Sequence, residues 1–342
     1  MESARVKTKR YTYFIGIDVS KDKLDFAVVE AGKLLFHQET ANEPEEIIPF
    51  VTGLKTLPKF ALSKALFCME HTGIYTNPLI ACLKKLKANT VVENALVIKN
   101  STGLIRGKYD KIDAIRIAQF AFKNKDTLRL WVDKRPVIVE LKSLFALRNR
   151  LLSTQMALRT PLKEQAAFVK KGLAKQSDQL CAKTIQAIAA DISVIDQTID
   201  VLLSSDERTK RLMQIITSVP AVGRVTAIQL IISTNEFRDI SDPKKFACYA
   251  GVAPFVKESG MFKGKGRVSS IANKRIKGIL HLCAMTAIRA KGPDQLRAYY
   301  DRKTLTEGKP KMAVLNAVRN KLILRIFACV NQDRLFEIQR MQ

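Results

Sequence analysis

Phe14-Ile15-Gly16-Ile17-Asp18 is a short apolar stretch that ends on an acidic residue. Its side chains predict a buried β-strand, and Asp18 stands where that strand leaves the sheet. Gly16 has no side chain, so a backbone or a ligand can come close to the strand there. A carboxylate on a rigid strand end is one way to build a metal site. The alternative is an Asp that only caps the next turn.

Three more acidic residues share this setting. A second apolar run, over residues 65–70, ends on Glu70, and a helical pattern begins at Asp110 with Asp113 on the same helix face. If the two strands are parallel neighbours, Asp18 and Glu70 lie at the same sheet edge, where α/β proteins bind ligands. Acids in a first helical turn also have a plain role, since they complement the helix dipole.

Carboxylates that lie close together repel one another unless a cation joins them. Their hard oxygen atoms suit Mg²⁺ or Mn²⁺. Two such ions can stabilise both the attacking and the leaving oxygen at a phosphodiester. The sequence therefore predicts a Mg²⁺ (or Mn²⁺) site made by Asp18, Glu70, Asp110 and Asp113.

The segments around these acids predict an α/β domain followed by helical regions. Further strands are expected at residues 24–30, 33–39 and 90–98, and helices at 78–86 and from 110. This order indicates a mixed sheet with an antiparallel start. Apolar residues at three- and four-residue spacing over 136–203 predict two long amphipathic helices, with an antiparallel coiled coil as one arrangement. Two more helices are expected at 271–290 and 311–330.

The charge of the chain points to a polyanionic partner. Its 342 residues carry a formal net charge of +26, and residues 257–342 hold 19 Lys/Arg against 6 Asp/Glu. A charge this large favours nucleic acid over a membrane as the partner. No apolar run is long enough to span a bilayer. The six cysteines never form a C-x-x-C pair, and the N-terminus has no signal-peptide pattern, so we expect a cytoplasmic protein.

A glycine-rich basic loop carries a second candidate for chemistry. Ser259 stands in this loop, and as a nucleophile it would attack a phosphate with nearby cations offsetting the charge. The plain alternative is a turn serine, and Ser269 and Ser270 are rivals that spacing does not exclude. The basic residues expected to bind nucleic acid are Lys257, Lys263, Lys265, Arg267, Lys274 and Arg275.

Taken together, these motifs resemble the IS one-ten insertion-sequence transposases, which are RNA-guided recombinases grouped with the pilin-gene invertases. The resemblance covers nearly the whole chain. In chain order the motifs are Ile15-Gly16-Ile17-Asp18 with Lys21 and Leu24-Asp25; Glu70-His71-Thr72-Gly73-Ile74-Tyr75; Lys108-Tyr109-Asp110-Lys111-Ile112-Asp113-Ala114; Val219-Pro220-Ala221-Val222-Gly223 with Thr226-Ala227; Phe246-Ala247 to Pro254; and Glu258-Ser259-Gly260.

The resemblance implies three domains. A RuvC-like, RNase H-type domain (residues 1–130) would hold the Asp-Glu-Asp-Asp tetrad, followed by a helical coiled-coil insertion (131–205) and a mainly helical transposase domain (206–342). It also implies that Ser259 forms a phosphoserine with DNA. The implied partners are target and donor duplex DNA, a noncoding guide (bridge) RNA, and further copies of the chain in a dimer or tetramer. The implied place is the nucleoid of a bacterial cell.

Other functions stay open at this point. One is a site-specific DNA invertase, and another is a RuvC-like endonuclease that uses water and does not need Ser259. A third is a nucleic-acid-binding scaffold without catalysis, which the intact set of four acids disfavours.

Overall fold

A computed structural model describes residues 11–101, 110–256, 258–259, 262–264, 266–290 and 295–337. The chain divides into two compact units, Met1–Asp133 and Lys134–Gln342. The long helices of residues 136–205 belong to the second unit, together with the rest of the C-terminal part. In the described part of the chain, no helix combines the length and the apolar character that a membrane crossing needs.

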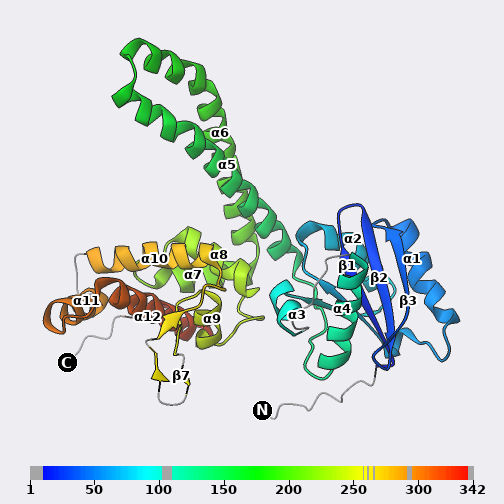
Figure 1. Cartoon of the computed structure of the whole chain (residues 1–342). Helices are drawn as coiled ribbons and strands as arrows, with labels where there is room; N and C mark the ends of the chain where they lie inside the picture. The colour runs from blue at the N-terminus through cyan, green and yellow to red at the C-terminus, as the bar shows by residue number, and fades with distance from the viewer. Residues whose placement is uncertain are drawn as a thin grey trace. The chain divides into compact units, whose positions relative to one another are not determined.

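The first unit is built on a five-stranded mixed sheet with the strand order β3-β2-β1-β4-β5 (Figure 1). Its strands are β1 (Tyr13–Val19), β2 (Lys23–Glu30), β3 (Lys33–Ala41), β4 (Ala65–Glu70) and β5 (Asn89–Glu93). The β1–β2 and β2–β3 pairs are antiparallel, whereas β1–β4 and β4–β5 are parallel. The predicted mixed sheet with an antiparallel start is confirmed.

Helices cover both faces of this sheet because alternate residues of its strands point to opposite sides. On one side, Ile15 and Ile17 of β1 pack with Phe50 of α1 (Pro44–Gly53) and with α2 (Asn77–Lys85). On the other side, Phe14 packs with α4 (Asp110–Asn124). Burial of each such side chain contributes about 1.5–3 kcal/mol. The short 3₁₀ segments are Leu54–Thr56, Leu62–Lys64 and Gly73–Thr76.

The strand expected over 90–98 is wrong in its second half. β5 ends at Glu93, and α3 (Ala95–Ser101) follows. The side chain of Asn94 accepts a hydrogen bond from the Leu96 backbone at 2.9 Å, and the Asn94 carbonyl accepts from Val97. A side chain that satisfies the free N–H groups of a first turn begins a helix, and this capping outweighs the apolar run.

The second unit is mainly helical (Figure 1). Its two long helices, α5 (Pro136–Phe168) and α6 (Lys171–Ser205), pack against each other, and Arg148 and Asp196 form an ion pair between them. This confirms the two predicted helices, whereas their coiled-coil form stays a prediction. The remaining helices are α7 (Glu207–Ser218), α8 (Arg224–Thr234), α9 (Pro243–Tyr249), α10 (Lys274–Arg289), α11 (Gln295–Asp301), a π-helical turn (Arg302–Thr306) and α12 (Lys311–Asn331).

A buried charge network fixes the start of α5 in this unit. Glu236 is 1% exposed, and its carboxylate lies 3.2 Å from the guanidinium groups of both Arg135 and Arg208. Arg135 also pairs with Asp206. The turn that carries Glu236 has positive φ at residues 235–237, a conformation that most residues avoid. The two arginines therefore hold a turn that is unfavourable by itself.

Candidate active site at the end of the parallel strands

Asp18 and Glu70 lie at the ends of neighbouring parallel strands. Ile17 of β1 is in register with Met69 of β4, so the next residue on each strand is an acid. Phe14 and Gly16, which precede Asp18 on the same face of β1, both contact α4. Alternation along the strands therefore places Asp18 and Glu70 on the face that α4 covers.

Gly16 brings α4 unusually close to the sheet. A methyl group at this position would lie 2.2 Å from both the Ala114 carbonyl oxygen and the Ala118 backbone nitrogen. The sequence predicted a close approach of a backbone or a ligand at Gly16, and the structure shows the backbone of α4. Because α4 begins at Asp110, this contact holds Asp110 and Asp113 of its first turn near the ends of β1 and β4.

The pKa of Asp18 shows that the four predicted acids influence one another. It is raised from 3.8 to about 6, first by burial and then by the negative charges of Asp110, Asp113, Asp25 and Glu70. The pKa of Glu70 is also raised, by burial and by the charge of Asp113. Like charges at close range favour a protonated or cation-bound state.

Two basic side chains partly neutralise this acidic group. The ammonium of Lys23 lies 3.0 Å from Asp110, 2.9 Å from Glu39 and 3.4 Å from Asp25. Its bonds to Glu39 and Asp110 raise the pKa of Lys23. Arg116 pairs with Asp113 at 2.6 Å, one turn further along α4. Lys23 therefore supplies a protein cation to the site where the sequence predicts a divalent ion.

The donor set fits a hard divalent cation in its chemistry, since it consists of carboxylate oxygens that repel one another. Among the residues that the structure describes, however, no three acidic, histidine or cysteine side chains are grouped closely enough to form a ready-made metal site. The salt bridges of Asp110 and Asp113 explain part of this. Their side chains would have to exchange Lys23 and Arg116 for a metal.

Asp25, His37 and Lys23 were missed as site residues by the sequence reasoning. Asp25 is directly opposite Asp18 in the β1–β2 pair and only 3% exposed, and it lies 2.8 Å from His37. The signal was the tight connection between β1 and β2, which puts residue 25 across from residue 18 in an antiparallel hairpin. Buried acids are rare unless they are paired. The burial of Asp25 and its contact with His37 therefore mark it as a residue of the site.

Asn42 joins the loops that follow β1 and β4. Its side-chain amide donates hydrogen bonds to the carbonyl oxygens of Ser20 at 3.0 Å and Tyr75 at 2.9 Å. The Asn42 side chain therefore connects the chain just beyond Asp18 with the chain just beyond Glu70. This contact helps to keep the two strand ends side by side.

Ser259 belongs to the second unit and lies on a short hairpin. The strand β7 (Glu258–Ser259) pairs with β8 (Phe262–Lys263), and the strand β6 (Pro254–Phe255) pairs with β9 (Arg267–Val268). Ser259 is exposed. Of its rivals, Ser269 accepts a hydrogen bond from the Ile271 backbone at 3.1 Å, whereas Ser270 is exposed.

The basic residues expected to bind nucleic acid have different surroundings. Lys257 and Lys265 lie outside the described residues, and Lys263 is described by its backbone alone. Arg267 and Lys274 are exposed. Arg275 is exposed as well, but its guanidinium lies 5.4 Å from the ring centre of Phe145 on α5, so it also has a packing role.

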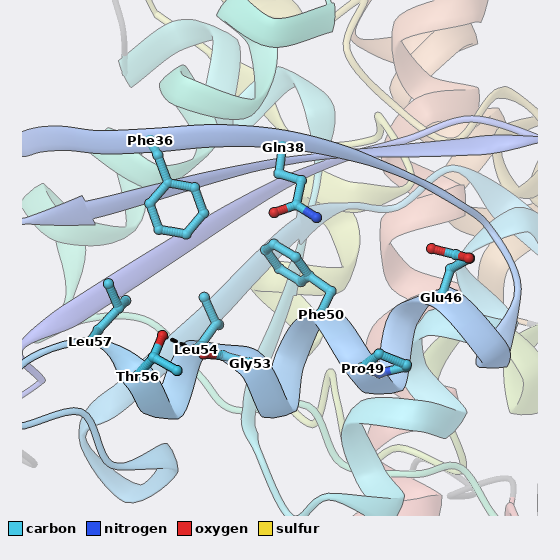
Figure 2. Close-up of a pocket in the computed structure, with 9 residues that line it drawn as sticks. All are labelled: Phe36, Gln38, Glu46, Pro49, Phe50, Gly53, Leu54, Thr56 and Leu57. Atoms are coloured by element: carbon cyan, nitrogen blue, oxygen red, sulfur yellow. Dashed lines mark hydrogen bonds between the residues drawn. The ribbon is translucent and has the colours of Figure 1, made fainter.

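A separate pocket of about 400 Å³ lies between β3 and α1 (Figure 2). Phe36, Phe50 and Leu54 line it, and they belong to the core on the opposite face of the sheet from α4. The acidic group and this pocket are therefore on different sides of the sheet, and the pocket plays no part in the candidate site.

Comparison with known proteins gives matches to both units. A DEDD transposase family model matches residues 15–166, and a model described as "Transposase IS116/IS110/IS902 family" matches residues 213–301. The pilin gene-inverting protein of Moraxella bovis is 22% identical over 95% of this chain and 97% of its own length. A 44.8 kDa protein of insertion element IS116 from Streptomyces clavuligerus is 21% identical over 97% of this chain and 98% of its own length.

One solved structure is similar to part of the chain. It is T. thermophilus RuvC in complex with a Holliday junction substrate, which is 14% identical and is matched over 35% of this chain and 100% of that chain. The TM-score is 0.27, a value too low to support a conclusion about fold or function.

Proposed function

The chain belongs to the IS116/IS110/IS902 family of DNA transposases, and we propose that it cuts and rejoins DNA with its sheet-end carboxylates and the hydroxyl of Ser259. The observation that carries this proposal is the convergence of Asp18, Glu70, Asp110 and Asp113. Burial and, after it, the charges of the neighbouring acids raise the pKa of Asp18 to about 6. A RuvC-like, RNase H-type fold of the first unit is part of the proposal, and the observed mixed sheet supports it.

In this proposal the four acids hold one or two Mg²⁺ or Mn²⁺ ions. When bound, the metal supplies Lewis acidity toward phosphate oxygens. The mutual repulsion of the acids supports the assignment. Lys23 and Arg116 offset this repulsion only in part, and a bound divalent cation would offset the remainder. Asp25, which contacts His37 at 2.8 Å, is a further acid directly opposite Asp18.

Ser259 is the proposed nucleophile. Its Oγ would attack a DNA phosphorus, lose its proton, and form a phosphoserine bond while the bond from phosphorus to the leaving DNA oxygen breaks. The leaving oxygen takes up a proton. In the second step a DNA hydroxyl attacks the phosphoserine, which restores the serine and joins the new strands. The exposed position of Ser259 on a short hairpin supports this role.

Guidance by a noncoding RNA and assembly of two or four subunits are further parts of the proposal. The net charge of +26 suits a protein that holds both target and donor DNA together with RNA. Because the acids and Ser259 belong to different units, a complete site would form when these units, or those of different subunits, meet on DNA. A cytoplasmic place at the bacterial nucleoid follows from this function.

A second candidate is site-specific inversion without mobility. It is favoured by the pilin gene-inverting proteins of Moraxella bovis and Moraxella lacunata, since each match covers 95% of this chain. A plasmid with the flanking DNA of the gene distinguishes the two functions, because inversion reverses a segment whereas transposition moves it. A RuvC-like endonuclease that uses water is the third candidate.

The test is a comparison of Ser259→Ala with Ser270→Ala. In a strand-exchange reaction with co-purified RNA and Mg²⁺, we expect Ser259→Ala to lose both the covalent protein–DNA adduct and the recombinant product. Ser270→Ala should retain both, because Ser270 is exposed and outside the hairpin. Recombination by Ser259→Ala at the wild-type rate would show that the nucleophile assignment is wrong and would favour water.

A further inference from the structure

Arg319 on α12 is a buried cation in the second unit. It is 6% exposed, and its Nη2 donates a hydrogen bond to His281 Nδ1 on α10 at 2.7 Å. Its Nη1 donates to the Asn316 side-chain oxygen at 3.3 Å, and its Nε has no hydrogen-bond partner among the described residues. Figure 1 shows α10 and α12 side by side, in agreement with their contacts.

Among the described residues, no acid forms an ion pair with Arg319. Burial lowers the pKa of its guanidinium. A buried charge without a counterion is unfavourable, and proteins normally pair it. The guanidinium therefore suits an anion supplied by a partner.

Arg319 also determines the state of His281. A guanidinium has donors only, so Nδ1 of His281 must accept, and the proton of the neutral ring is on Nε2. Burial and the charge of Arg319 both lower the pKa of His281. His281 is half-buried. The ring therefore presents an N–H donor without a charge of its own.

Two lysines share the flank of α10 with His281. Lys274 and Lys277 precede it by seven and four residues, a spacing that places the three side chains on one side of a helix. Lys274 is exposed and Lys277 is half-buried. In the described part of the chain neither lysine has an ion-pair partner. This flank of α10 thus carries two lysines and the neutral donor His281, which contacts the buried Arg319.

The same group contacts Gly251 and Val252, which precede the serine hairpin and are called its base below. Asn316, which accepts from Arg319, donates through its Nδ2 to the Val252 carbonyl at 2.7 Å. The Lys277 side chain lies beside Gly251, where an added methyl group would be 3.6 Å from its Cδ. The strand β6, which leads toward Ser259, begins at Pro254. Hydrogen bonds therefore run from His281 through Arg319 and Asn316 to Val252, two residues before β6.

We propose that Lys277, His281 and Arg319 form a binding site for a backbone phosphate of nucleic acid at the base of the serine hairpin. Lys277 supplies a positive charge, the Nε2–H of His281 donates to a phosphate oxygen, and Arg319 orients that ring and adds a buried positive charge. The inference rests on the proposed function in one respect, namely that the partner is DNA or RNA.

The test measures the binding of labelled duplex DNA and of labelled single-stranded RNA by the full chain over a range of salt concentrations. Lys277→Met removes the charge but keeps the packing against Gly251, and Lys55→Met removes the same charge from an exposed position in the first unit. We expect Lys277→Met to bind several-fold more weakly, with a log–log salt slope smaller by about one. Lys55→Met should match the wild type.

Variants of His281 give a different signature. His281→Phe removes both ring nitrogens, and we expect several-fold weaker binding with an unchanged salt slope, because a neutral donor releases no counterion. His281→Gln keeps an acceptor for Arg319 and an N–H donor, so it should bind like the wild type. Thermal melts of each variant show that the chain is folded.

Three results would overturn the inference. If folded Lys277→Met binds as tightly as Lys55→Met, Lys277 does not contact the phosphate. If folded His281→Gln binds as weakly as His281→Phe, an N–H donor at position 281 does not contribute to binding. If the wild type binds neither probe, the proposed function fails and this inference fails with it. If the Lys277→Met and His281→Phe variants lose affinity for only one of the two probes, that probe identifies which nucleic acid supplies the phosphate.

Discussion

Gly16 on β1 and Ala118 on α4 meet backbone to backbone, since a methyl group on Gly16 would lie 2.2 Å from the Ala118 nitrogen. Any larger residue at position 16 would displace α4. The contact sets the distance between the sheet and the helix whose first turn carries Asp110 and Asp113. The arrangement of the acidic group therefore depends on a glycine that takes no part in its chemistry.

Gly16→Ala should destabilise the first unit and abolish strand cleavage. The added methyl group meets backbone atoms that cannot rotate away, so we expect a loss of about 1–3 kcal/mol or more in the free energy of unfolding. Urea unfolding and a cleavage assay measure the two effects. Gly53→Ala is the matched control, because Gly53 ends a helix and, outside that helix and its chain neighbours, no described atom lies within 4 Å of the added methyl group. An active, fully stable Gly16→Ala protein would contradict the close packing.

The raised pKa of Asp18 predicts a pH-dependent stability without metal. Between 3.8 and about 6 the folded state binds more protons at this group than the unfolded state, so its contribution to stability falls as the pH rises through this window. Asp18→Asn removes this titration. In EDTA, the Tm of Asp18→Asn relative to the wild type should rise from pH 4 to about 7, and Mg²⁺ should narrow the difference.

Asp126→Asn serves as the control for this pH series, because Asp126 is an exposed residue beyond the end of α4. Its Tm should follow that of the wild type at every pH. A Tm difference between Asp18→Asn and the wild type that is constant with pH would mean that burial and the neighbouring acids do not raise the pKa of Asp18.

Lys23→Met should make the first unit more dependent on divalent cations. The change keeps the aliphatic stem but removes the ammonium that Asp25, Glu39 and Asp110 share. We expect a lower Tm in EDTA and a larger increase of Tm with Mn²⁺ than in the wild type. Lys33→Met, an exposed residue at the other end of the β2–β3 hairpin, should change neither value. Equal Mn²⁺ responses in both variants would argue against a role of Lys23 in the acidic group.

Glu236→Gln should destabilise the second unit by on the order of 3 kcal/mol, because it leaves Arg135 and Arg208 without their shared buried carboxylate. The neighbouring helix offers a matched control. Glu207→Gln affects a side chain that is 90% exposed in an ion pair of 3.8 Å, so its effect should stay within about 0.5 kcal/mol. Chemical denaturation measures both. Equal effects of the two changes would show that the network does not hold the turn.

Much of the first unit could be predicted because its signals are local. The apolar runs that end on Asp18 and Glu70 define two strands, and strict alternation determines which residues face each side. The first turn of α4 is readable from Asp110 and Asp113. The change from strand to helix at Asn94 could not be predicted, because a side-chain cap competed with an apolar run that is equally typical of a strand.

The sequence by itself determined the identity of the acids, the large positive charge and the order of strands and helices, since these depend on neighbouring residues. Tertiary structure decided that Asp25 faces Asp18, that Lys23 lies among three acids, and that Arg319 meets His281 across two helices. These contacts join residues through strand register and helix packing. Both arise from the burial of whole faces, so no local pattern in the sequence specifies them.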